Sequence, residues 1–266
     1  MTANTEAHEL STKTHKAGAP LEYVLGRAQF MGRTFHCSPA TLIPRAETGE
    51  LVEATIEVIR QEQQTKQALT LVEIGIGCGN IAVSLALATE HVKILASDVS
   101  SAAVEVARRN VAEFGLQERI KLFSGDLFEP FEGEGLANNL DIVVCNPPYI
   151  PTASLNKLAS EIIDFEPRLA LDGGPYGIDF FLRLISEAPK VLKPGGTLLF
   201  EIGERQENLV QYLFEKGAFE EIEPILYRTS VRGFRAVKSL VKIGTQSHEP
   251  DRQVDFSGKS VGAHTG

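Results

Sequence analysis

Residues 69–80 read LTLVEIGIGCGN, and this stretch decides the fold. It begins as a short apolar run of the kind that forms a buried strand and ends in three alternating glycines, Gly75, Gly77 and Gly79. Glycine has no Cβ, so the backbone can turn sharply there and come close to a ligand. A helical pattern, NIAVSLALATE, follows at residues 80–90. The stretch therefore predicts a strand, a glycine-rich turn and a helix, the opening unit of an α/β sheet.

Strands and helices alternate along the rest of the chain. We expect strands at 92–98, 119–126, 140–146 and, after the turn Pro194–Gly196, up to residue 203; helices at 101–115, 177–192 and 204–217; and a final antiparallel strand pair at 219–227 and 232–240. Apolar strands separated by helices form a parallel sheet covered on both faces. We predict an α/β protein with a Rossmann-like, mostly parallel seven-stranded sheet that ends in an antiparallel pair.

The segment before residue 69 predicts an extension to this sheet. Two short runs with aromatic and β-branched residues flank Met31-Gly32-Arg33, a plausible hairpin connection. After Pro44, apolar side chains recur at helical spacing from Leu51 to Ile59. We divide the chain into a flexible N-terminus (1–19), a β-hairpin and helix extension (20–66), the main domain (67–243) and a disordered tail (244–266).

Composition narrows the possible classes of protein. The 266 residues are 43% hydrophobic and 23% charged, as in ordinary globular proteins. The net charge of −9 disfavours a nucleic-acid partner, which requires clustered Lys and Arg. Cys37, Cys78 and Cys145 form no CxxC pair, which favours a reducing, cytoplasmic compartment. The N-terminal residues have no apolar core of a signal peptide, and we expect no membrane-spanning segment.

The spacing of the glycines indicates a particular cofactor. The dinucleotide fingerprint G-x-G-x-x-G requires glycine at position 80, where the chain has Asn80. The pattern here is G-x-G-x-G, with an acidic residue two places before Gly75. That combination suits S-adenosylmethionine, which has no pyrophosphate to bind. A tight turn with no ligand is the alternative interpretation.

Two further acidic positions follow strand ends. Asp98 lies about 20 residues beyond the glycine loop, the spacing at which an acid accepts hydrogen bonds from ribose hydroxyls. The alternative is a helix N-cap, although Ser100 or Ser101 can fill that position. After the next strand, Asp126 can reach an adenine amino group and its apolar neighbour Leu127 can pack on the ring; the alternative for Asp126 is a surface turn.

Residues Asn146-Pro147-Pro148-Tyr149 follow the fourth predicted strand and indicate the chemistry. A nitrogen that accepts a methyl group has to present its lone pair, which in an amide is delocalised into the carbonyl. Acceptors that take both N–H bonds orient the group, and the Asn146 side-chain oxygen and the Pro147 carbonyl are suited to this. The prolines stiffen the turn, and Tyr149 can stack on or shield the planar group. A strand-ending turn is the alternative interpretation.

Other catalytic constellations have little support. The six histidines are scattered and none lies beside these motifs, so we expect neither a metal site nor a Ser-His-Asp triad. Cys78 and Cys145 are interpreted as packing residues rather than nucleophiles.

Longer segments carry a resemblance to a known family. The stretches 20–53 (PLEYVLGRAQFMGRTFHCSPATLIPRAETGELVE), VCNPPYIP, 165–181 (FEPRLALDGGPYGIDFF) and 198–206 (LLFEIGERQ) resemble the HemK/PrmC family of class I S-adenosylmethionine-dependent methyltransferases. That family methylates the glutamine amide in the Gly-Gly-Gln loop of peptide chain release factors. The resemblance covers roughly residues 20–242. The Asn-Pro-Pro-Tyr motif alone is shared with adenine and other amino methyltransferases, whereas the flanking segments are more specific.

The resemblance implies the site residues by position. Cofactor contacts fall on Gly75, Ile76, Gly77, Cys78, Gly79, Asp98, Asp126, Leu127 and Asn146. Substrate contacts fall on Asn146, Pro147, Pro148 and Tyr149, with Asn146, Pro147 and Tyr149 in the catalytic role. Residues 165–168 resemble an element near the substrate pocket and receive no catalytic role.

The chain departs from the family pattern at three places. The helical N-terminal domain usual in the family is not expected in the polar residues before Pro20. The usual Pro-Glu-Thr-Glu is Ala46-Glu47-Thr48-Gly49 here, and Leu127 stands where tryptophan is common. These changes leave methyl transfer intact and leave the methyl acceptor open.

The sequence thus predicts a methyltransferase that uses S-adenosylmethionine and acts on the glutamine amide of a release factor-like protein. The nearest alternative keeps the fold and takes an amine or amide of a small metabolite, with adenine in nucleic acid disfavoured. A nicotinamide-dependent oxidoreductase and a non-catalytic binding module are further alternatives. Asn80 counts against the first and the intact Asn146–Tyr149 motif against the second.

Overall fold

One seven-stranded sheet forms the centre of the computed structural model, which describes residues 18–240. The strand order is β5-β4-β3-β6-β7-β9-β8. The strands are β3 (Leu69–Ile74), β4 (Val92–Asp98), β5 (Ile120–Ser124), β6 (Leu140–Cys145), β7 (Leu192–Glu201), β8 (Phe219–Tyr227) and β9 (Ser230–Lys238). The first five pair in parallel, and β9 runs antiparallel to both β7 and β8. The predicted α/β fold class is confirmed, including the C-terminal antiparallel pair.

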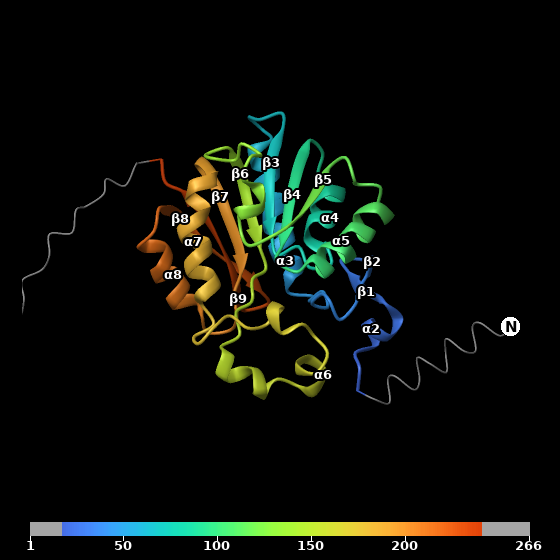
Figure 1. Ribbon diagram of the computed structural model, residues 1–266. Helices are drawn as coiled ribbons and strands as arrows, with labels where there is room; N and C mark the ends of the chain where they lie inside the picture. Colours follow the sequence, from blue (N-terminus) through green and yellow to red (C-terminus); the bar gives the residue numbers. More distant parts are fainter. Residues whose placement is uncertain (1–17, 241–266) are drawn as a thin grey trace, which may run out of the picture.

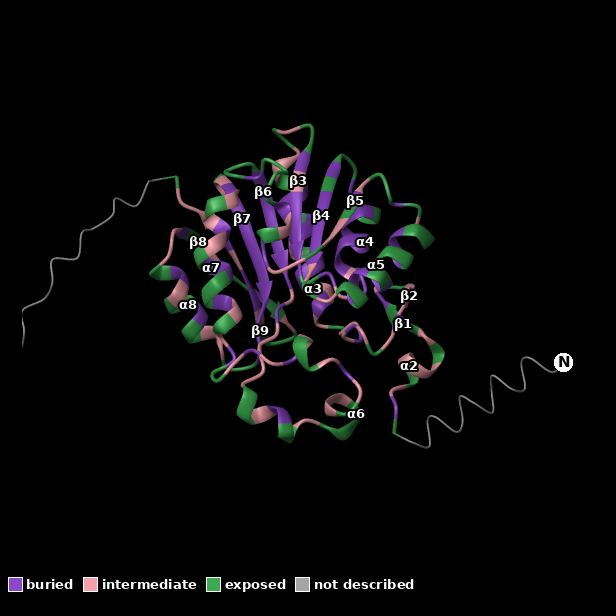
Figure 2. Cartoon of the chain, in the orientation of Figure 1, coloured by how far each residue is buried: buried purple, intermediate pink, exposed green. Residues whose placement is uncertain are grey.

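Helices cover both faces of the sheet (Figure 1). The helices α3 (Thr48–Glu62), α4 (Asn80–Ala88) and α5 (Ser101–Glu113) share one apolar cluster with the sheet. The helices α7 (Asp179–Val191) and α8 (Glu207–Glu215) share another on the opposite face. The central strands are consequently buried while the outer helix faces are exposed (Figure 2). Every residue of β6 is buried, as expected for an interior parallel strand.

The predicted hairpin consists of β1 (Arg27–Phe30) and β2 (Arg33–His36). Its two-residue turn places both Met31 (φ 45°) and Gly32 (φ 74°) in the left-handed region, as a type I′ turn requires. A short helix that the sequence did not predict, α2 (Leu21–Leu25), precedes it. Asn110 of α5 holds the hairpin in place, because its Oδ1 accepts the His36 N–H (2.7 Å) and its Nδ2 donates to the Cys78 carbonyl (2.7 Å).

The connection from β6 to α7 crosses the carboxyl ends of the parallel strands (Figure 1). It contains the 3₁₀ turns η2 (Thr152–Lys157) and η3 (Arg168–Ala170) and the four-residue helix α6 (Ser160–Ile163). A third 3₁₀ turn, η1 (Glu129–Phe131), follows β5. The predicted turn Pro194–Gly196 lies within the bounds of β7, where the pairing with β6 jumps from Leu192 to Thr197. The turn is therefore an irregularity inside the strand rather than a loop before it.

The predicted division into four segments stays a prediction. Residues 1–17 and 241–266, which hold nearly all of the two predicted terminal segments, lie outside the described residues. Within residues 18–240 no helix has the length and apolar character needed to cross a bilayer.

Candidate active site

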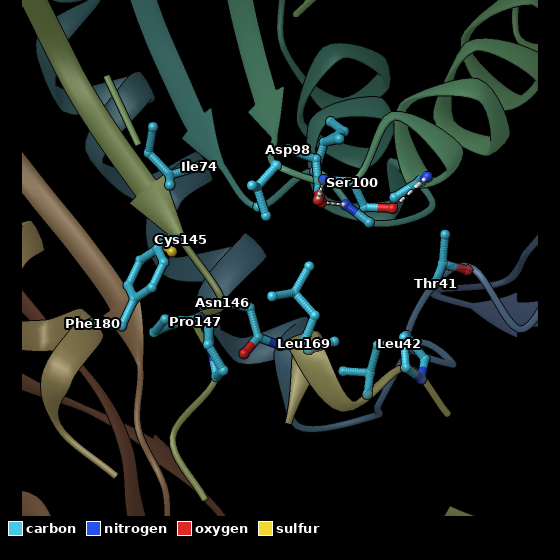
Figure 3. A pocket seen from close by; sticks show the side chains of 18 of the residues that line it. Thr41, Leu42, Ile74, Asp98, Ser100, Cys145, Asn146, Pro147, Leu169 and Phe180 are labelled. Atoms are coloured by element: carbon cyan, nitrogen blue, oxygen red, sulfur yellow. Dashed lines mark hydrogen bonds between the residues drawn. The ribbon is translucent and has the colours of Figure 1, made fainter. Parts of the chain in front are cut away.

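A cavity of about 750 Å³ lies at the carboxyl ends of β3, β4, β5 and β6. Its inner wall comes from the segments that follow these strands, where parallel sheets bind ligands. Its outer wall comes from residues 40–45, after the hairpin, and residues 167–170, before α7. Figure 3 shows Asp98 and Ser100 on one side of the cavity and Asn146 and Pro147 on another, with Leu169 pointing between them. Ten of the predicted site residues line this cavity; Gly79 and Tyr149 do not.

The glycine loop that follows β3 adopts a backbone that other residues resist. Gly75, Gly77 and Gly79 have φ of 75°, 53° and 85°, in the left-handed region. The first two line the cavity together with Ile76 and Cys78. Gly79 instead packs against α5, since a Cβ there would meet the Ala107 Cβ at 3.5 Å. The loop therefore exposes backbone to a ligand and also fixes the start of α4 against α5.

Asp98, the last residue of β4, is held by the loops on both sides of it. Its Oδ2 accepts the Gly77 N–H (3.0 Å) and its Oδ1 accepts the Ser100 N–H (2.9 Å). Burial raises the pKa of Asp98, and these two N–H donors oppose the rise. Ser100 caps α5 by accepting the Ala103 N–H (3.2 Å), so Asp98 is not the N-cap. Each carboxylate oxygen retains acceptor capacity toward hydroxyl groups in the cavity.

Asp126 and Leu127 follow β5 and differ in what they present. The Asp126 carboxylate takes a bidentate pair from Arg183 of α7, at 2.7 and 3.3 Å. Leu127 is buried, lines the cavity and has a φ of 44°, and its carbonyl accepts the Ser97 hydroxyl (3.0 Å). Leu127 thus offers an apolar surface to a ring. The adenine assignment of both residues stays a prediction.

Asn146 lies at the end of a hydrogen-bond chain that begins in β7. Its Nδ2 donates to Thr48 Oγ1 (3.1 Å), and that hydroxyl donates to Glu201 Oε2 (2.7 Å). The Tyr149 hydroxyl donates to the other oxygen, Glu201 Oε1 (3.2 Å). Asn146, Pro147 and Pro148 line the cavity, whereas Tyr149 packs into the core beside α7 and α8. Tyr149 therefore supports the site from behind in this structure, and its predicted stacking role stays a prediction.

Glu73 is a site residue that the sequence analysis noticed but did not assign. It lies on β3, lines the cavity and is fully buried. Its Oε2 accepts the Ala82 N–H (2.9 Å), whereas its Oε1 is buried without a hydrogen-bond partner in the described part of the chain. Burial raises the pKa of Glu73 well above its usual value. A buried unpaired oxygen is costly, so a ligand with a polar donor would stabilise this end of the cavity.

Thr48, Glu201 and Arg45 received no role from the sequence, and Glu166 was placed near the substrate pocket only through the family resemblance. Glu166 is buried, takes an ion pair from Arg45 (2.5 Å) and accepts the Ile43 N–H (3.2 Å). This pair joins the two segments of the outer wall. The available signal was that all four residues lie in the segments that carry the family resemblance.

The residues of the cavity fit S-adenosylmethionine. An acid suited to ribose hydroxyls, an apolar surface at Leu127, an exposed glycine backbone and the unpaired Glu73 oxygen match a nucleoside joined to an amino acid. The thiols of Cys78 and Cys145 are buried, which raises the pKa of each and leaves both unreactive. Among residues 18–240 there is no group of three or more His, Cys, Asp and Glu side chains arranged to hold a metal ion.

Comparisons with known proteins agree with this geometry. A family model described as "Methyltransferase small domain" matches residues 52–178. The release factor glutamine methyltransferase of Clostridium acetobutylicum is 40% identical over 210 residues, covering 78% of this chain and 71% of that protein. The ribosomal protein uL3 glutamine methyltransferase of Bordetella pertussis is 38% identical over 212 residues, covering 79% and 66%. The ribosomal protein L11 methylase structure from Lactobacillus delbrueckii subsp. bulgaricus has a TM-score of 0.52 at 18% identity, covering 73% and 80%, and shows the fold alone.

Sheet order, cavity and matches together define a class I S-adenosylmethionine-dependent methyltransferase fold. The sequence identity to the glutamine methyltransferases shows more than a shared fold, because it extends across most of the described residues. The chain belongs to the release factor glutamine methyltransferase family, HemK/PrmC. It spans about two thirds of the length of the curated relatives it matches.

Proposed function

We propose that this protein transfers a methyl group from S-adenosylmethionine to the side-chain amide nitrogen of a glutamine in a protein substrate. The orientation of Asn146 carries the proposal. Its Nδ2 is engaged by Thr48, and its Oδ1 accepts no hydrogen bond from any residue in 18–240. That oxygen is the acceptor that a planar N–H₂ group in the cavity requires.

The cofactor supplies an electrophilic methyl group on a sulfonium when bound. The protein's own residues orient the acceptor. In this proposal Asn146 Oδ1 and the Pro147 carbonyl, both from residues that line the cavity, accept the two N–H bonds of the substrate amide, which polarises those bonds toward nitrogen and stabilises the positive charge that develops there. One of these N–H protons is then released, and S-adenosylhomocysteine is the other product. Pro147 has no N–H and a fixed φ, so its carbonyl direction is stiff. Holding both partners in one geometry supplies much of the rate.

The substrate we propose is a peptide chain release factor. Release factor methyltransferases provide most of the strongest matches, and the uL3 enzyme of Bordetella pertussis keeps a ribosomal protein as a second candidate. Val99 and Leu169 both line the cavity and are more than half exposed, so the entrance offers apolar surface to an incoming loop. A cytoplasmic location is part of the proposal, because it is where both candidates occur with S-adenosylmethionine.

The test is methylation of purified proteins with isotopically labelled S-adenosylmethionine. We expect label on one glutamine of the release factor, located by peptide mass spectrometry. Asn146→Ala should lose most turnover and retain cofactor binding, whereas Asn208→Ala, an exposed asparagine on α8, should behave as wild type. Label found only on uL3 would redirect the substrate. Label found only on small molecules of a cell extract would refute a protein substrate.

A further inference from the structure

We propose that Thr48 and Glu201 are positioning residues that lock the side-chain amide of Asn146 with its oxygen toward the cavity. The proposal deepens the proposed function, since the orientation matters only if Asn146 Oδ1 accepts a substrate N–H. Thr48 opens α3 and Glu201 closes β7, so the two residues come from elements 153 positions apart in sequence.

The direction of each hydrogen bond follows from the chemistry of the groups. An ionised carboxylate only accepts hydrogen bonds, so the single hydroxyl proton of Thr48 is donated to Glu201 Oε2, at 2.7 Å. The Thr48 oxygen can then only accept from Asn146, at 3.1 Å. The amide therefore has to present its N–H₂ group to Thr48. The two ends of an asparagine amide have nearly the same shape, and this chain is what distinguishes them.

The hydrogen-bond chain from Glu201 through Thr48 to Asn146 is rigid because Thr48 and Glu201 are both enclosed. Thr48 and Glu201 are each 1% exposed. The Tyr149 hydroxyl holds the second carboxylate oxygen, so Glu201 cannot rotate without losing a second bond. An enclosed, fully paired network has one arrangement, whereas a surface residue would allow several.

We call this hydrogen-bonded arrangement of Asn146, Thr48 and Glu201 the lock. It depends on the charge of Glu201. Burial raises the pKa of Glu201 to about 7, with Glu47 adding to the rise and Arg232 opposing it. Tyr149 and Cys145 also face this carboxylate, and burial raises the pKa of each, so both stay protonated at neutral pH. A protonated Glu201 can donate to Thr48, which frees the Thr48 proton for a bond to Asn146. The Asn146 side-chain amide can then flip, so that its N–H₂ group rather than its oxygen faces the cavity. We therefore expect kcat to rise with pH through about 7.

Three substitutions in α3 test the lock. Thr48→Val removes the hydroxyl at nearly constant shape, and we expect kcat to fall about ten- to a hundredfold while the Kd for S-adenosylmethionine is unchanged. Thr48→Ser keeps the hydroxyl and should retain kcat within about threefold. Thr55→Val is the matched control: Thr55 is equally buried in the same helix, and its hydroxyl donates to the Leu51 carbonyl, away from Asn146.

Glu201→Gln supplies the pH readout. It should flatten the rise of kcat near pH 7, because a glutamine does not titrate. Equal kcat in Thr48→Val and wild type, or an equal loss in Thr48→Ser and Thr48→Val, would overturn the proposal.

A second readout does not depend on the substrate. The side-chain N–H₂ signals of Asn146, assigned by their loss in Asn146→Asp, should be slow to exchange and shift with a midpoint near pH 7. They should move in Thr48→Val and stay in place in Thr55→Val. If the wild type methylates no release factor, these signals still decide the positioning role, and the proposed function alone fails. Unmoved signals in Thr48→Val would refute the lock even in an active enzyme.

Discussion

Glu201→Gln should change how the stability of the protein depends on pH. Burial raises the pKa of Glu201 from 4.5 to about 7, and each pKa unit corresponds to about 1.4 kcal/mol. The difference amounts to about 3 kcal/mol of folding free energy. The carboxylate is almost fully enclosed, so this energy is not reduced by solvent screening.

The sign follows from the direction of the pKa change. Between pH 4.5 and about 7 the folded protein holds a proton on Glu201 that the unfolded chain has released. Raising the pH through this window therefore favours unfolding, and the stability contributed by the protonated Glu201 is fully lost above about pH 7. A glutamine has no proton to lose. The free energy of unfolding of Glu201→Gln, relative to wild type, should accordingly rise by about 3 kcal/mol from pH 4 to pH 8.

Urea unfolding at a series of pH values measures this difference. The chain contains no tryptophan, so helical circular dichroism is the suitable signal. Glu73 is present in both proteins and cancels in the comparison, although burial also raises its pKa. Asn208→Ala, at an exposed position of α8, replaces a side chain that carries no titratable proton and is a control that should show no such slope. A wild-type-to-variant difference that stays constant across the series would refute the assignment of a raised pKa to Glu201.

Three further predictions concern the cofactor, the core and the outer wall. Asp98→Ala should weaken S-adenosylmethionine binding by about tenfold or more in calorimetry, because a half-buried acceptor is lost; an unchanged Kd would contradict its role. Phe181→Ala should lower the free energy of unfolding by about 3–5 kcal/mol, since this fully buried ring stacks on Phe200 with the ring centroids 5.2 Å apart. A loss below about 1 kcal/mol would mean that neighbouring core side chains close the cavity left by the ring and would contradict this estimate. Glu166→Gln should cost about 3 kcal/mol by leaving Arg45 without its ion pair, and equal urea midpoints would show the pair to be dispensable.

The sheet could be predicted because its signals are local. The strand at 140–146 is a short apolar run bounded by turn residues, and the structure buries all of β6. Glycines and the helical pattern after Pro44 fixed the element boundaries within a few residues. The hairpin was predicted from two short runs that flank Met31-Gly32-Arg33, and the structure places Met31 and Gly32 of this connection in the left-handed region.

The short helices could not be predicted in this way. The helix α2 spans five residues and buries none of them, so it leaves no apolar periodicity in the sequence. Its boundaries come from Pro20 and from Gly26, which has a φ of 66°. The helix α6 spans four residues and also buries none. Elements this short are set by their termini and tertiary contacts rather than by an amphipathic pattern.

The site was predictable only on its strand ends. The glycine loop follows β3, Asp98 ends β4 and Asn146 follows β6, and parallel strands bring such positions to one edge. Thr48, Glu201 and Glu166 contact their partners across more than a hundred residues of sequence. No spacing rule connects such positions. Their contacts depend on how α3 and the outer wall dock onto the sheet.

The sheet order explains why the buried carboxylates belong to the site. Asn146 follows β6, which lies between β3 and β7, and these two neighbours carry Glu73 and Glu201. Apolar residues at both positions would make a more stable sheet, because an enclosed carboxylate is costly to desolvate. The buried Glu201 carboxylate orients the Asn146 amide through Thr48, at the cost of its own desolvation. Glu73 leaves one carboxylate oxygen unpaired beside the glycine loop. Destabilisation concentrated on both sides of a single asparagine is expected where a protein has to hold a reactive geometry rather than only a fold.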